Sequence, residues 1–159
     1  MKKITKLLVA TAILTMLFAV PVMARDVSFS SENTDYLIVL LNNNTAKLNN
    51  DLNDFIRVQS GPNAQAVIAA QKALVADKIA RVNKECAENH IDCLTKKVAD
   101  AKKDQQNRLN ELNWFKTLHG GATTNEVLAA QKIYDAAVAD TAAKEAYLAA
   151  AKTKLAPFM

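Results

Sequence analysis

Helix-breaking residues interrupt the central part of this chain at only two places, Gly61-Pro62 and Gly120-Gly121. The 159 residues include three Gly and three Pro, whereas average usage would give about eleven and about eight. Multi-stranded sheets need many turn residues, and their strands favour aromatic and β-branched side chains. Because aromatic residues make up only 6% of the chain, the sequence predicts an all-α protein.

Residues 1–24 have the pattern of a secretory signal peptide. Basic residues come first, an apolar run follows, and small residues fit a cleavage site: Lys2, Lys3 and Lys6, then 7–20, then Val22 and Ala24. The apolar run is shorter than the roughly 20 residues that span a bilayer. We therefore expect cleavage, a flexible leader at residues 25–32, and a secreted or periplasmic product with no membrane insertion.

Cleavage would also change the charge of the chain. The full sequence has 20 basic and 16 acidic side chains, a net charge of +4, and losing three lysines leaves 17 against 16, a net charge of +1. Binding to nucleic acid depends on basic patches that neutralise phosphates. The near-neutral mature chain therefore predicts no nucleic-acid partner.

Apolar residues recur at spacings of three and four from residue 33 onward, as in amphipathic helices. Four such stripes can be traced: Leu37, Leu41, Leu48, Leu52 and Phe55; Ile68, Val75, Ile79, Val82 and Cys86; Leu94, Val98, Ala101, Leu109 and Leu112; Val127, Tyr134, Val138, Thr141 and Leu148. Thr123 with Glu126 predicts a capping box, and Asn63 can cap the preceding helix.

The two cysteines, Cys86 and Cys93, decide how the segment 63–118 is divided. As one straight helix it would extend about 84 Å and hold the two Cα atoms about 10.5 Å apart. A disulfide needs about 4.4 to 6.8 Å and is the usual state of a cysteine pair in an exported chain. We therefore expect a disulfide at a corner formed by Asn89 and Asp92, with an intermolecular bond as the alternative.

These features together predict four helices near 33–59, 63–88, 92–118 and 123–155, followed by a tail at 156–159. The chain also matches itself at an offset of 60 residues: Asn50 to Phe55 aligns with Asn110 to Phe115, and Gly61 with Gly121. Such a match indicates a duplicated helical hairpin, with repeats at about 33–90 and 92–155. The expected fold is an up-down-up-down antiparallel four-helix bundle, a single domain over 33–155.

The sequence contains little that could support catalysis. It lacks a Gly-rich phosphate loop, a zinc-protease motif and a nucleophile elbow, so we predict a protein that is not an enzyme and has no cofactor. One cluster could hold a soft metal ion, namely Cys86, His90 and Cys93 with Glu88 or Asp92. The disulfide is the favoured alternative at this position, with His90 exposed at the turn.

Aromatic side chains provide the candidates for partner binding. Helical periodicity places Trp114 and Tyr147 on outer faces, where such residues often anchor partners, although Trp114 could instead fold over the Gly120-Gly121 turn. Residues 36–41, beginning with Tyr36, are six apolar residues in a row, a self-association surface unless the leader covers them. Three functions follow: a non-catalytic module that binds a protein or cell-surface partner, a carrier of a small ligand or metal, and an oligomerising structural bundle.

Overall fold

The computed structural model describes residues 33–159, and this part of the chain is all-α, with no strand. It contains three α-helices, α2 (Thr34–Val58), α3 (Ala64–Leu118) and α4 (Asn125–Leu155), followed by the 3₁₀ turn η1 (Ala156–Phe158). The predicted signal peptide and leader lie outside the described residues.

The four-helix prediction is wrong, because α3 is a single helix of 55 residues that continues through the expected corner. Asn89 does not take the left-handed conformation, since every described residue with positive φ is a glycine, and Asp92 is exposed within the helix instead of capping a new one. The buried stripe passes through this segment without interruption, by way of Ala87, His90 and Leu94. Asn and Asp cost a helix only a fraction of a kcal/mol each, so burial of this stripe outweighs their preference for a turn.

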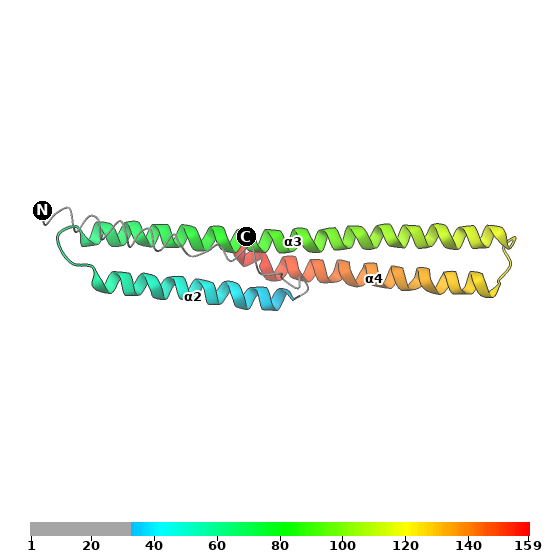
Figure 1. Cartoon of the computed structure of the whole chain (residues 1–159), viewed down its shortest axis with the longest axis horizontal. Helices are drawn as coiled ribbons and strands as arrows, with labels where there is room; N and C mark the ends of the chain where they lie inside the picture. The colour runs from blue at the N-terminus through cyan, green and yellow to red at the C-terminus, as the bar shows by residue number, and fades with distance from the viewer. Residues whose placement is uncertain (1–32) are drawn as a thin grey trace, which may run out of the picture. The chain divides into compact units, whose positions relative to one another are not determined.

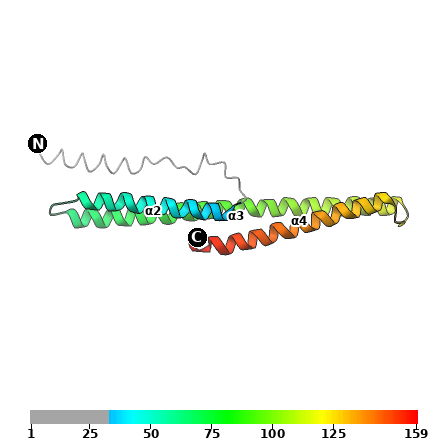
Figure 2. The same cartoon turned by 90° about the horizontal axis from the view of Figure 1, so that it is seen from below.

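Helices α2 and α4 both run antiparallel to α3 but pack along different halves of it (Figure 1). Thr45 of α2 accepts a hydrogen bond from Asn83 in the first half of α3. Glu145 of α4 forms an ion pair of 2.8 Å with Lys102 in the second half. The start of α2 and the end of α4 meet near the middle of α3, as the second view also shows (Figure 2). The described chain is therefore two hairpins that share one long helix.

Glycine makes both connections between the helices. Gly61 has a φ of 103°, and Gly120 and Gly121 have φ values of 58° and 82°, a region that costs other residues steric strain. The Gly121 N–H donates to the Lys116 carbonyl at 2.8 Å and so satisfies one of the last carbonyls of α3. These turn residues therefore have the structural role that the sequence predicted.

The helix caps agree only in part with the sequence. Asn63 precedes α3 but its side chain makes no capping hydrogen bond, and α4 begins two residues later than expected. Its N-cap is Thr124, not Thr123: the Thr124 hydroxyl accepts from the Val127 N–H at 3.4 Å.

The core includes two separate clusters of buried residues along α3. One cluster lies at the junction of all three helices and contains Leu37, Leu41, Ala87 and Leu155. The other lies near the turn between α3 and α4 and contains Leu112, Val127 and Ala130. The four predicted stripes contribute most of the buried hydrophobic residues. The periodicity therefore identified most of the inward-facing residues, although Val138 of the fourth stripe is exposed.

Candidate functional site

A polar contact joins all three helices at their junction. Thr34, the first residue of α2, donates from its backbone N–H to the Tyr147 hydroxyl at 3.0 Å and from its own hydroxyl at 3.1 Å. The same Thr34 hydroxyl lies 3.1 Å from Nε2 of His90. The Thr34 hydroxyl has a single proton, which it donates to Tyr147, so it can only accept a hydrogen bond from His90. The hydrogen-bond network therefore assigns the ring proton of neutral His90 to Nε2, which donates to Thr34.

The surroundings of His90 favour its neutral imidazole form. Its side chain is in the core of the junction and the residue is only 8% exposed. Burial lowers the pKa of His90 below its ordinary value, and the positive charge of Lys97 on the same helix lowers it further. A charged imidazolium is therefore disfavoured while the junction is closed.

An ion pair flanks this contact on the solvent side. The Lys154 ammonium of α4 lies 2.7 Å from the Asp35 carboxylate of α2. Both side chains are substantially exposed, so the pair contributes little to stability on its own. It does, however, link the same two helix ends that Thr34 and Tyr147 join.

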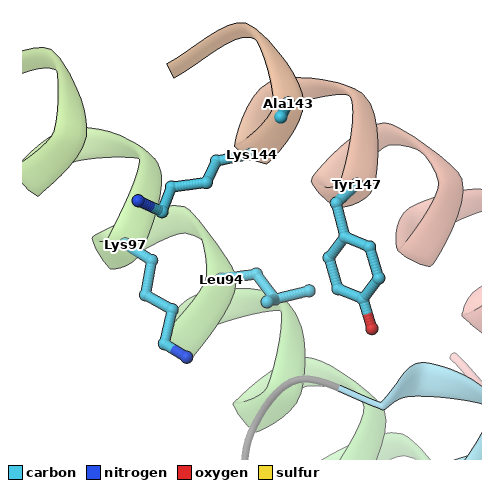
Figure 3. A pocket seen from close by; sticks show the side chains of 5 residues that line it. All are labelled: Leu94, Lys97, Ala143, Lys144 and Tyr147. Carbon is cyan, nitrogen blue, oxygen red and sulfur yellow. The ribbon is translucent and has the colours of Figure 1, made fainter. Parts of the chain in front are cut away.

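A groove runs between α3 and α4 next to the junction (Figure 3). Its volume is about 330 Å³, and its walls are formed by Leu94, Lys97, Ala143, Lys144 and Tyr147. The Lys144 ammonium is paired with Asp140 one turn earlier in α4. The volume is at the low end for a small-molecule site, and the groove is partly open to solvent.

The cysteines do not form the expected disulfide. Cys86 and Cys93 are both free, and they stand seven residues apart on the unbroken helix α3, a rise of about 10.5 Å that exceeds disulfide reach. Cys86 packs against the junction core. Burial raises the pKa of the Cys86 thiol, and the neighbouring Glu85 raises it further.

The proposed metal cluster is not assembled either. Within residues 33–159 no group of three His, Cys, Asp or Glu side chains is placed to hold a metal ion. His90 directs Nε2 towards Thr34, so it does not stand exposed at a turn with the two thiols. The three candidate ligands thus share a helix without sharing a site.

Trp114 lies on an outer face as predicted and is 59% exposed. It does not lie free: its ring meets the ring of Phe115 edge to face, with centroids 4.9 Å apart and planes at 68°. Leu118, one turn later on α3, is 61% exposed.

Tyr147 and Tyr36 differ in what they offer to a partner. The Tyr147 hydroxyl is engaged by Thr34, so this residue fastens α2 to α4 within the chain. Tyr36 is exposed, as is Val39, while Leu37 and Leu41 are buried in the junction core. The run 36–41 is therefore not wholly exposed, and only its outer side remains for self-association, which stays a prediction.

The sequence did not identify Thr34 as a site residue, nor His90 as its partner. A signal for His90 was present, because it continues the stripe from Val82 and Cys86 to Leu94 at helical spacing. Thr34 could not have been found in this way, since its partners are distant in the sequence.

In comparisons with protein-family models, curated proteins and solved structures, the chain gives no significant match. Among the helices of residues 33–159, none has the length and apolar character needed to cross a membrane.

Proposed function

We propose that this chain is a secreted or periplasmic, non-catalytic helical module that binds a protein or cell-surface partner through the outer face of α3 near its C-terminal end. The observation that carries the proposal is the exposed indole of Trp114, with Leu118 one turn away on the same face. Exposed tryptophan is among the residues that contribute most to binding when a partner covers it.

The support beneath Trp114 strengthens this proposal. Phe115, which contacts the indole edge to face, itself packs against the core cluster of Leu112, Val127 and Ala130. The indole therefore contacts a side chain that is fixed by packing against the core. Such a contact restricts the indole before binding and so reduces the conformational entropy that it loses on binding.

A duplicated hairpin remains our proposed origin for the fold, now with three helices in place of four. Helix α2 ends at Val58 and α3 ends at Leu118, which is an offset of 60 residues, as in the sequence match. The glycines that follow at the same offset, Gly61 and Gly121, both have positive φ. In this account the second helix of the first hairpin continues directly into the first helix of the second.

The duplication supplies a matched control for the binding test. Val58 corresponds to Leu118, is 69% exposed, and lies on the other hairpin. Wild type, Trp114→Ala, Leu118→Ala and Val58→Ala would be immobilised and exposed to cell-surface extract of the producing cells. We expect wild type and Val58→Ala to retain the same defined protein, Trp114→Ala to lose it and Leu118→Ala to retain less of it. Equal retention by wild type and all three variants would exclude this face as the binding surface.

Export is the second part of the proposal and is tested separately. We expect the protein recovered from producing cells to begin at Arg25 and to lie outside the cytoplasmic membrane. Recovery of a cytoplasmic protein that still carries residues 1–24 would contradict export without bearing on the Trp114 face.

A further inference from the structure

Packing is uneven along the contact between α2 and α3. The buried residues of α2 are Thr34, Leu37, Leu41 and Leu48, so its last ten residues contribute none. Among these ten, Leu52, Phe55 and Ile56 are half-buried, and the first part of α3 buries Val75 and the polar Gln71. Beside Thr45, the Oδ1 atom of Asn83 is buried with no hydrogen-bond partner among the described residues. Buried polar atoms without partners oppose burial. The fully buried residues of α2 are therefore concentrated towards its N-terminal end.

That end is where the three-helix contact lies. Thr34 is bonded to His90 of α3 and to Tyr147 of α4, and the adjacent Asp35 is paired with Lys154. His90 is the one group among these contacts whose ordinary pKa, about 6.5, lies near neutral pH.

We propose that the first turn of α2 is a pH-sensitive latch: a charged His90 ring is disfavoured in the buried three-helix contact, so protonation favours a state in which the start of α2 has moved away from α3 and α4 and the ring reaches water. This inference is independent of the partner-binding face around Trp114, which lies on the other hairpin.

The charged and polar groups around His90 determine whether protonation of its ring favours the closed or the open state of α2. From α2, Asp35 could favour a charged imidazole, but its carboxylate is engaged by Lys154 of α4. From α3, Lys97 opposes the charge. From α4, the Tyr147 hydroxyl is the group at the contact. Opening of α2 lets the ring reach water, so the charged form favours the open state.

The pH dependence follows from this preference. The closed state binds the proton less readily than the open state, so closure is fully favoured above the ordinary pKa of about 6.5 and weakens as the pH falls through the lowered value. The open helix would present the apolar stripe of Leu37, Leu41 and Leu48 to solvent or to another molecule.

Hydrogen exchange of the purified protein tests the latch. Exchange would be measured at about pH 7.5 and about pH 5.5, on either side of the ordinary histidine pKa, with correction for the intrinsic chemical rate. We expect protection of residues 34–58 to fall about twofold or more at the lower pH. Protection near Leu112 and Val127 should stay constant.

The variant His90→Gln separates titration from packing, because the Gln amide can still donate to Thr34 but carries no charge. It should abolish the pH effect on α2. Lys97→Gln gives a second readout should that variant fold poorly, and it should make the pH effect smaller. A wild-type α2 equally protected at both pH values would overturn the latch, as would the same acid response in His90→Gln or a uniform loss of protection over all helices.

Discussion

The hydroxyl of Thr34 lies 3.1 Å from Nε2 of His90 and joins the beginning of α2 to the middle of α3 across 56 residues of sequence. Both residues are buried, so the His90 Nε2 atom depends on the Thr34 hydroxyl for its hydrogen bond. The same threonine also reaches Tyr147. A single residue at a helix start therefore ties together the two hairpins that share α3.

Replacing Thr34 by Val keeps the shape of the side chain but leaves the His90 N–H buried without an acceptor. An unsatisfied buried donor costs about 1–3 kcal/mol, and we expect the free energy of unfolding at neutral pH to fall by about this amount. Urea denaturation followed by circular dichroism measures the change. Thr34→Ser, which keeps the hydroxyl, is the control and should lose less. Equal stability of wild type and Thr34→Val would show that the hydrogen bond is unimportant.

The start of α4 gives a prediction that distinguishes the structure from the sequence pattern. Thr124 caps the helix, so Thr124→Ala should lower the free energy of unfolding by about 1 kcal/mol, while Thr123→Ala should have little effect. A larger loss of stability in Thr123→Ala than in Thr124→Ala would instead support the capping box expected from the sequence.

Acid should reduce the difference in stability between the Thr124→Ala and Thr123→Ala variants. A hydrogen bond from the backbone N–H of Glu126 and a second one from the Thr124 side chain lower the pKa of the Glu126 carboxyl below its ordinary value of 4.5. The stabilisation is present above that value and is lost as the pH falls through the lowered one. Repeating the denaturation series in acid checks the sign, since a difference that grows on acidification would contradict it.

The single-helix structure of α3 predicts two free thiols in each chain. Cys86 should react more slowly than Cys93 with an aromatic disulfide reagent near neutral pH, because its thiol packs in the junction and its pKa is raised. The variants Cys86→Ser and Cys93→Ser assign the two phases. A chain with no reactive thiol and the mass of a monomer would instead indicate the disulfide that the structure excludes.

Sequence periodicity predicted the inward faces of the helices because burial follows the helical repeat, as Leu37, Val98 and Leu112 illustrate. Glycine placement predicted both connections for an equally local reason, since Gly61 and Gly121 adopt backbone conformations that few other residues tolerate.

The prediction of a corner at Asn89 and Asp92 was wrong because it was inferred from the chemistry of a cysteine pair and from weak turn preferences. Tertiary burial of His90 and its neighbours outweighs such preferences. The three-helix contact could not be predicted at all: Thr34 and Tyr147 are 113 residues apart, and no local pattern specifies which distant side chains meet.

The shared-helix architecture depends on the continuity of α3, and the distance between two labelled positions on α3 tests it. Spin labels would be placed at Ala73 and Asn107, both exposed, in a Cys86→Ser, Cys93→Ser background, and their separation measured by pulsed electron resonance. A continuous helix places these positions about 51 Å apart, at 1.5 Å for each of the 34 residue steps from 73 to 107. A break near residue 90 would bring them to the spacing of neighbouring packed helices, about 8–10 Å between axes. The long distance is our prediction, and a short one would contradict the shared-helix architecture.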